Sequence, residues 1–458
     1  MANGSENQTV TSSRGNWGTH IGFIMAAAGS AIGLGNIWKF PYITGVYGGG
    51  AFVLIYLICV LIVGLPMMIA ELIIGRKTQK NPVGAFKDAL KNNKTAWQIT
   101  GWLGLATGFL ILSFYSIIAG WALAYIFKSI GGFTGGAEAI QSQFVDLVMS
   151  PGQTILWHTI FMALTIGIVI GGIQRGIERW SKILMPLLIL ILVALVIHGL
   201  FFTTGGMQAV DFLFNPHWDE LSAEGVLSAL GHAFFTLSLG MGAMITYGSY
   251  MKKSESLTRD AITISFLDTF IALLAGLAIF SLVFTFKLDP AAGPGLIFQT
   301  LPVLFEQTGP SISVPFFILL SFAALTSAIS LLEVVVSYFI DEHKWSRLKA
   351  TLILGTAIYL TGLLSGIASL TISFRGKEQG FLDIFDFITT NYMLPIGGLL
   401  TCLFVAWIMP TKDKEEQFGS KGFLYHGLIF LLRFVTPIAI LIIILHGLEM
   451  LPFMTYGQ

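Results

Sequence analysis

The sequence predicts an all-α polytopic membrane protein, in which about eleven transmembrane helices form two inverted five-helix repeats. First, only 11% of its 458 residues are charged and 55% are hydrophobic, whereas soluble proteins carry about 25% charged residues. Second, eleven apolar runs are long enough to cross a bilayer, which takes about 20 residues. Third, the first and sixth of these runs are interrupted near their centres by glycine-containing segments.

The apolar runs leave no room for a long soluble insertion. We expect a cytoplasmic tail at 1–16, a first five-helix repeat at 17–202, an extracellular loop at 203–223, a second repeat at 224–409, and a cytoplasmic loop with the eleventh span at 410–458. The tail is polar and is not expected to be a cleavable signal peptide. The predicted spans are 17–41, 50–75, 100–130, 153–172, 178–202, 224–250, 258–286, 312–341, 348–367, 382–409 and 422–449.

Basic residues predict the orientation. Most of the 25 Lys and Arg residues fall in the tail and in the connections that share its side of the membrane. Because cytoplasmic loops carry an excess of Lys and Arg, we expect the N-terminus in the cytoplasm. An odd number of spans then places the C-terminus on the outer side.

The first run reads GSAIGLGN at its centre, with Gly29, Gly33 and Gly35. Each glycine costs about 1 kcal/mol in a helix interior, and a turn opened in lipid is tolerated only where other groups satisfy its backbone. One interpretation is a helix broken into two halves, whose freed carbonyls bind a cation and whose freed amides bind a carboxylate. The alternative is an unbroken helix that uses its glycines for close packing.

The sixth run is interrupted at a comparable place, in FFTLSLGMG between Phe234 and Gly242. Interrupted helices at matching positions of two halves indicate a transporter with inverted repeats and a binding site at mid-membrane. Because each set contains five spans, the second set must enter the membrane from the opposite side. The eleventh span lies outside the repeat.

Ionisable residues within the apolar runs are costly and are therefore candidates for function. Asp268 in the seventh run requires a cation, a proton or a hydrogen bond from a neighbouring helix. Glu71 in the second run is expected to brace the broken helices. In the eighth run, Thr326 and Ser327 offer the oxygen ligands that hard cations prefer, although such hydroxyls commonly bond back to their own helix.

The sequence also excludes several classes of function. The formal net charge is zero, so no nucleic-acid partner is expected. Cys59 and Cys402 lie in separate apolar runs and form neither a disulfide framework nor a zinc motif. No catalytic Ser-His-Asp set or phosphate-binding loop occurs, so an enzyme is not expected. A channel needs a continuous polar stripe, which is missing here, and a seven-span receptor does not fit eleven spans.

Three segments carry a resemblance to a known family: GSAIGLGNIWKFPYITGVYGGGAF, FFTLSLGMGAMITYGSY and FAALTSAIS. They closely resemble the neurotransmitter:sodium symporter family, and in particular its bacterial amino-acid branch. The resemblance covers essentially all spans from Trp17 onward. It implies two inverted five-helix repeats and sodium-coupled uptake of an amino acid by alternating access.

The resemblance also implies the ligands of two sodium ions and one amino acid. The first ion would meet Ala31, Asn36, Thr236 and Asp268, and the second would meet Gly29, Ile32, Ala323, Thr326 and Ser327. Gly33 stands where monoamine transporters carry an aspartate, so we exclude monoamines. The pocket is apolar and contains an adaptable methionine, which indicates a hydrophobic or aromatic L-amino acid. Its predicted residues are Ala31, Leu34, Gly35, Ile111, Tyr115, Ile118, Phe235, Thr236, Ser238, Met241, Ser327 and Leu331.

Two gates are implied in the same way. The outer gate resembles Lys39 facing Asp386, and because lysine cannot make a bidentate pair we expect a looser gate than an arginine would give. The inner gate would pair Arg14 with Asp341, braced by Trp17 and Tyr250. In the fifth span, the spacing of Gly176 and Pro186 resembles an element at which some relatives unwind the helix.

The resemblance therefore predicts a symporter that uses sodium but not chloride, because Asp268 supplies the negative charge. The alternative is a proton-coupled amino acid carrier of the same fold, with Asp268 as the proton site. We expect a multi-pass protein of the bacterial inner membrane, surrounded by the lipid bilayer. The sequence predicts neither an oligomeric state nor the preferred amino acid.

Overall fold

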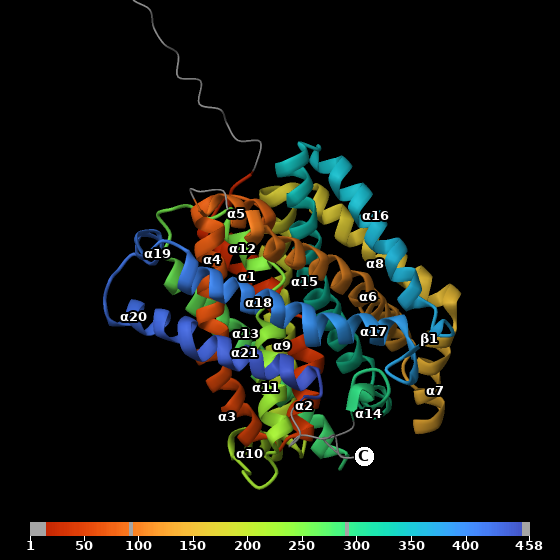
Figure 1. Cartoon of the computed structure of the whole chain (residues 1–458). Helices are drawn as coiled ribbons and strands as arrows, with labels where there is room; N and C mark the ends of the chain where they lie inside the picture. The colour runs from red at the N-terminus through yellow and green to blue at the C-terminus, as the bar shows by residue number, and fades with distance from the viewer. Residues whose placement is uncertain (1–14, 91–94, 289–292, 451–458) are drawn as a thin grey trace, which may run out of the picture.

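The computed structural model describes residues 15–90, 95–288 and 293–450. In these residues the chain is a bundle of long helices with one short hairpin (Figure 1). Nine helical stretches of the described chain are long and apolar enough to cross a membrane, and the bent pair His20–Ala31 and Gly35–Val46 makes a tenth. Two further helices, on either side of a break at 237–242, complete the eleven predicted spans.

The first five spans occupy the chain up to Phe202. Only the first span is broken. In several spans a short π-helical turn replaces part of the α-helix without breaking it. The elements are α1 (His20–Ala31), η1 (Gly35–Lys39), α2 (Phe40–Val46), α3 (Gly50–Cys59), η2 (Val60–Gly64), α4 (Leu65–Thr78), α5 (Pro82–Asp88), η3 (Thr95–Trp97), α6 (Gln98–Ile130), α7 (Gly136–Met149), α8 (Pro151–Ile170), η4 (Ile173–Glu178) and α9 (Arg179–Phe202).

The remaining six spans follow a connection on the outer side of the predicted topology. The elements are α10 (Gly206–Phe214), α11 (Ala223–Thr236), α12 (Ala243–Gly248), α13 (Leu257–Thr285), η5 (Gly293–Leu296), α14 (Thr300–Thr308), α15 (Pro310–His343), α16 (Arg347–Gly366), β1 (Thr371–Phe374), β2 (Lys377–Gly380), α17 (Phe381–Ile388), η6 (Thr389–Met393), α18 (Leu394–Leu403), η7 (Phe404–Ile408), α19 (Thr411–Phe418), α20 (Phe423–Phe430), η8 (Leu431–Val435) and α21 (Thr436–Gly447).

Span one (α1, η1 and α2) is broken at 32–34. The side chain of Thr19 caps the start of α1, and Ile32 ends it by turning to an extended conformation with ψ 102°. The helix then restarts, and its two halves meet at an angle of 50°. The interpretation of an unbroken glycine-rich helix is therefore wrong.

Span six (α11 and α12) is broken at 237–242 by left-handed backbone. Ser238, Gly240 and Gly242 have φ angles of 55°, 81° and 77°. Glycine adopts such angles without steric cost, whereas serine does so rarely. Figure 1 shows that α1 lies above α2 and α12 above α11, so the two broken spans run in opposite directions through the centre of the bundle.

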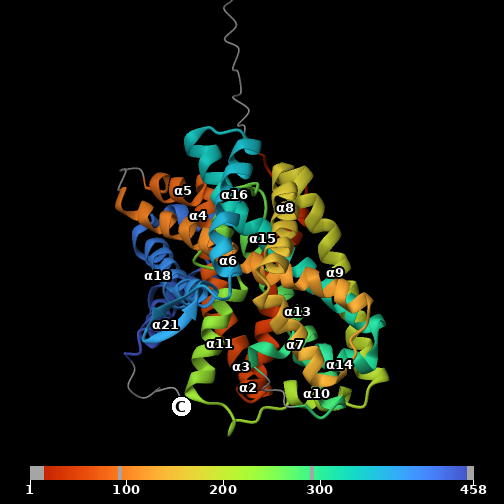
Figure 2. The ribbon, with the colours of Figure 1, turned by 90° about the vertical axis from the view of Figure 1, so that its right-hand side faces the viewer.

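The rest of the bundle encloses these two helices. The long helices α6 and α15 pack against one another, and α8 and α16 pack against both of them (Figure 2). Apolar side chains on the surface of α9, such as Leu187, Leu190 and Ile197, are more than one-third exposed. Such exposure suits helices that meet lipid rather than water.

The connections on the predicted outer side contain short helices and a hairpin that the pattern of apolar runs does not predict. Helices α7, α10 and α14 lie there, and the antiparallel hairpin β1–β2 precedes α17 (Figure 2). α7 is only moderately apolar, and α10 and α14 have nine residues each, so none resembles a membrane span.

Candidate functional site

The break in span one turns backbone amides toward the interior of the bundle. The Gly33 amide donates to Asn36 Oδ1 at 3.0 Å, and the Leu34 amide donates to the Tyr115 hydroxyl at 3.3 Å. These are amides at the start of the second half-helix, where the helix dipole favours negative charge. The arrangement can bind a carboxylate between the Leu34 amide and Tyr115.

A charged cluster lies beside this break, around Asp268 of α13. Asp268 is fully buried, and its carboxylate accepts from Asn36 Nδ2 at 2.8 Å and from Thr236 Oγ1 at 3.0 Å. The Tyr56 hydroxyl lies 3.4 Å away on the other side. In the part of the chain that the structure describes, no Lys, Arg or His side chain forms an ion pair with Asp268. Three of the four residues predicted for the first sodium ion are therefore in direct contact.

A second, neutral cluster joins span one to α15. Ser327 Oγ lies 3.4 Å from the carbonyl oxygens of Gly29 and Ile32 and 3.1 Å from that of Ser30. Thr326 Oγ1 bonds back to the Ala323 carbonyl at 3.0 Å. The two hydroxyls thus behave differently, because Thr326 bonds to its own helix while Ser327 reaches the carbonyls that the break frees. All five residues predicted for the second sodium ion meet here.

A small cavity of about 30 Å³ lies between the two broken helices. Its volume is enough for about two water molecules. The side chains that line it would therefore have to move apart to admit an amino acid. Ile118 is the one predicted pocket residue that does not line it. The lining residues are Ser30, Ala31, Gly33, Leu34, Gly35, Ile111, Tyr115, Phe235, Thr236, Ser238, Met241, Ser327 and Leu331.

A larger cavity of about 340 Å³ adjoins the first on the predicted outer side. Leu34, Gly35, Tyr115 and Phe235 line both cavities and therefore lie at the boundary between them. Ile118 lines the outer cavity, together with Lys39 and Asp386. Among the described ion pairs there is none between Lys39 and Asp386, and Lys39 Nζ instead lies 4.9 Å from the centre of the Phe235 ring.

Gly33 is closely surrounded inside the small cavity. A Cβ atom at this position would lie 2.5 Å from Ser327 Oγ and 3.1 Å from the Tyr115 hydroxyl. A side chain at position 33 would therefore have to displace the Ser327 hydroxyl, and the cavity has no carboxylate at this position to pair with an amine.

Glu71 of α4 braces the break in span six, as expected. It is fully buried, and its Oε1 accepts from the Gly240 amide at 2.7 Å. Gly240 has lost its helical partner because the backbone there is left-handed. The carboxylate satisfies that amide, which would otherwise be unpaired within the membrane.

The ends of the broken spans that are predicted to be cytoplasmic are in direct contact. Trp17 Nε1 donates to the Tyr247 carbonyl at 3.1 Å, and the Trp17 and Tyr250 rings pack edge to face at 6.0 Å. Asp341 accepts from the Asn81 amide at 2.9 Å. Arg14, the predicted partner of Asp341, lies outside the described residues.

Three residues at these sites were not predicted. The Ser30 carbonyl accepts from Ser238 Oγ at 2.8 Å and so connects the two breaks. Tyr56 contacts Asp268, and Glu333 of α15 accepts from Tyr250 at 2.7 Å and pairs with Arg347 at 2.7 Å. Glu333 was detectable, because a carboxylate within the apolar run LLEVVV has the same cost as Asp268. Ser30 and Tyr56 have no comparable signal.

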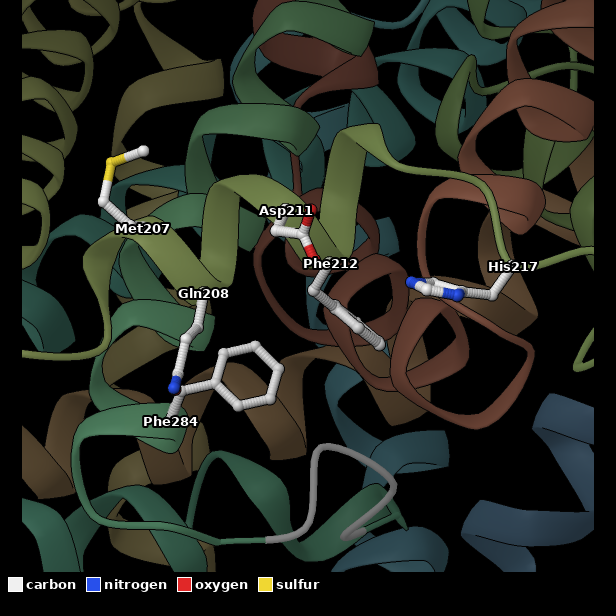
Figure 3. Close-up of a pocket in the computed structure, with 6 residues that line it drawn as sticks. All are labelled: Met207, Gln208, Asp211, Phe212, His217 and Phe284. Atoms are coloured by element: carbon white, nitrogen blue, oxygen red, sulfur yellow. The ribbon is translucent and has the colours of Figure 1, made fainter.

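A further hollow of about 440 Å³ lies at α10 and the connection that follows it (Figure 3). Four of its residues belong to α10, and Phe284 of α13 completes one side with its ring (Figure 3). It is an open depression that contains none of the predicted site residues. The residues that line it are Met207, Gln208, Asp211, Phe212, His217 and Phe284.

Two antiparallel broken helices around a cavity, with two oxygen clusters beside the break in span one, define a membrane transporter with inverted repeats. Comparison with known proteins gives the family. The model of the sodium:neurotransmitter symporter family matches residues 14–135 and 134–458, and the chain belongs to this family. Its members are transporters and not enzymes.

Individual relatives extend over nearly the whole chain. An uncharacterized sodium-dependent transporter of Bacillus subtilis strain 168, YhdH, is 42% identical over 95% of this chain and 98% of its own length. A similarly described protein of Haemophilus influenzae is 33% identical over 96% of this chain and 99% of its own. The crystal structure of MhsT in complex with L-phenylalanine has 43% sequence identity and a TM-score of 0.87, and the match covers 95% of this chain and all of that one.

Proposed function

We propose that this protein is a sodium-coupled symporter that imports hydrophobic or aromatic L-amino acids. The observation that carries the proposal is the fully buried Asp268 carboxylate, which forms no described ion pair and lies beside the break in span one. A buried charge without a partner is costly. Its surroundings offer oxygen ligands, which suit a hard cation such as sodium.

The substrate class follows from the small cavity. The Leu34 amide and the Tyr115 hydroxyl are suited to a carboxylate, while Ile111, Met241 and Leu331 provide an apolar wall. The similar protein MhsT has been solved with L-phenylalanine, which has these two features. The crowding at Gly33 argues against a monoamine, because no carboxylate is available there.

Two sodium ions are proposed, one at each cluster. The first would share the substrate carboxylate with Asp268, Asn36, Thr236 and Ala31, so that sodium and amino acid each strengthen the binding of the other. Chloride is not required in this scheme, because Asp268 provides the negative charge. The bundle that contains spans one and six would rock against the remaining helices to alternate access.

The proposed setting is the bacterial inner membrane, with a cytoplasmic N-terminus and an outer C-terminus. The domain boundaries expected from the sequence remain part of this proposal: two repeats at 17–202 and 224–409, followed by the eleventh span. The excess of basic residues on the N-terminal side supports this orientation.

Uptake of labelled L-phenylalanine into proteoliposomes tests the proposal. We expect uptake that requires an inward sodium gradient, that continues when gluconate replaces chloride, and that unlabelled tryptophan or leucine reduces. Uptake that is independent of sodium would contradict the proposal.

A proton-coupled carrier is the second candidate, because a proton would also neutralise the buried Asp268. The same proteoliposomes distinguish the two. Uptake driven by an inward proton gradient in sodium-free buffer would favour this candidate, whereas a proton gradient without effect excludes it.

A further inference from the structure

Glu178, at the cytoplasmic end of span five, binds the start of span one. Its Oε2 accepts from the Gly18 amide at 2.7 Å, and its Oε1 accepts from the Thr19 amide at 3.1 Å and the Thr19 hydroxyl at 2.7 Å. The Glu178 side chain is only 4% exposed. Backbone amides at a helix start have no partner within the helix, and a carboxylate is favoured there.

Neighbouring residues are arranged to keep this contact. Gly22, one turn into α1, leaves the space that the carboxylate occupies, because a Cβ atom there would overlap the Glu178 side chain. Lys182, one turn further along span five, pairs with Glu178 Oε1 at 2.6 Å. Gln174, one turn before Glu178, donates to the Asn16 carbonyl at 2.9 Å. One face of span five therefore binds the chain that enters span one.

The part of span five that carries Glu178 is a weak stretch of helix. Ile173–Glu178 is π-helical, and Pro186 lies inside α9. Proline has no amide hydrogen, so the carbonyl four residues earlier, at Lys182, lacks its helical partner. Glu178 thus ends the π-helical turn and lies one turn before the carbonyl that Pro186 leaves without a helical partner.

α1 in turn carries carbonyl oxygens of the neutral cluster, at Gly29 and Ile32. Gly29 also faces span five, because a Cβ atom at this glycine would lie 3.2 Å from the sulfur of Met185. The same Cβ atom would lie 3.1 Å from Thr326 of α15, so span five and α15 lie on one side of Gly29. A movement of α1 away from span five would therefore also carry these carbonyls away from Ser327.

We propose that Glu178 is a positioning residue that holds the cytoplasmic half of span one against span five, and that its release opens the cytoplasmic path. This proposal rests on the alternating-access function proposed above. The carboxylate links a change in the weak start of span five to the position of α1, and through α1 to the neutral cluster.

Thiol labelling tests this role independently of transport. The reporter is Ser337→Cys in a background with Cys59→Ser and Cys402→Ser. Ser337 is 1% exposed and lines a cytoplasmic cavity, so its labelling in sodium should be slow in inside-out vesicles treated with a membrane-impermeant thiol reagent. Glu178→Gln should raise the labelling rate about five-fold or more, the range of a typical coupling energy.

Two further variants separate the proposed role from loss of folding. Gly22→Ala displaces the Glu178 carboxylate while it favours the helix by about 1 kcal/mol, and it should raise the labelling rate as well. Arg179→Gln removes an exposed charge from the same turn and should leave the rate unchanged.

The proposal is overturned if Glu178→Gln and Gly22→Ala both label within about twofold of the reporter protein, or if Arg179→Gln labels as fast as they do. Failure of the proposed function would look different. In that case the reporter protein itself would take up no amino acid with sodium, whatever its variants do to the labelling rate.

Discussion

The two oxygen clusters at the broken helices differ in how they obtain negative charge. The cluster around Asp268 has a formal charge and takes its side chains from four spans, through Asn36, Tyr56 and Thr236. The cluster around Ser327 has only dipoles, which are carbonyls freed by the break in span one and hydroxyls of α15. Cation binding at the first cluster would depend on the ionised Asp268 carboxylate. Cation binding at the second would depend on the backbone conformation at the break in span one.

This difference implies that the clusters respond differently to mutation and to movement. Removing the charge should greatly weaken the first cluster, because only the substrate carboxylate would then be left to balance a cation there. Removing one dipole from the second should only weaken it, since several oxygens remain. A displacement of α1, in contrast, should affect the second cluster more, because its carbonyls move with that helix.

Asp268→Asn should have the largest effect. Losing one partner of a buried charge pair costs about 3 kcal/mol, which corresponds to about 100-fold in affinity. The sodium concentration for half-maximal L-phenylalanine uptake should rise by this factor, and the remaining uptake should require chloride.

Asp211→Asn is the matched control, because Asp211 is an exposed carboxylate on α10. It should leave the sodium requirement unchanged. Normal uptake by Asp268→Asn in chloride-free buffer would show that the charge is not what makes the first cluster bind.

Ser327→Ala should have an intermediate effect. One hydroxyl contributes about 1 kcal/mol, so the half-maximal sodium concentration should rise about five-fold. Ser321→Ala is the control on the same helix, because Ser321 bonds only to its own helix at 2.8 Å. A loss as large as that of Asp268→Asn would mean that the two clusters do not differ in the way described.

Tyr56→Phe should have the smallest effect. Its hydroxyl lies 3.4 Å from Asp268, which is longer than a normal hydrogen bond between oxygens. We expect a change of about twofold in the half-maximal sodium concentration, since a weak bond contributes less than about 1 kcal/mol. A change above about ten-fold, measured in the same uptake assay, would make Tyr56 an essential part of the charged cluster.

Much of the architecture could be predicted from local sequence. The number of spans follows from the lengths of the apolar runs, and the breaks follow from Gly29, Gly33 and Gly35 in span one and from Gly240 and Gly242 in span six. These signals are local because a helix in lipid must satisfy its own backbone. The outer helices α7, α10 and α14 lack such a signal, since they are short and packed against other elements.

The site was predicted less completely, for a physical reason. Glycine and intramembrane carboxylates are unusual enough to identify, so Gly33, Glu71 and Asp268 could be selected. The contacts of Ser30 and Tyr56 depend on which helices lie side by side, and a single serine or tyrosine in an apolar run does not indicate its neighbour. The placement of Ile118 in the outer cavity depends in the same way on the rotation of α6.

The packing around Gly33 also limits how this protein can evolve. Any side chain there must first turn the Ser327 hydroxyl away from the span-one carbonyls, because a Cβ atom would lie 2.5 Å from it. An acidic residue at position 33 could give the protein specificity for decarboxylated amines. The same substitution would weaken the neutral cluster. Compensating substitutions in α15 would therefore have to precede such a change of substrate specificity.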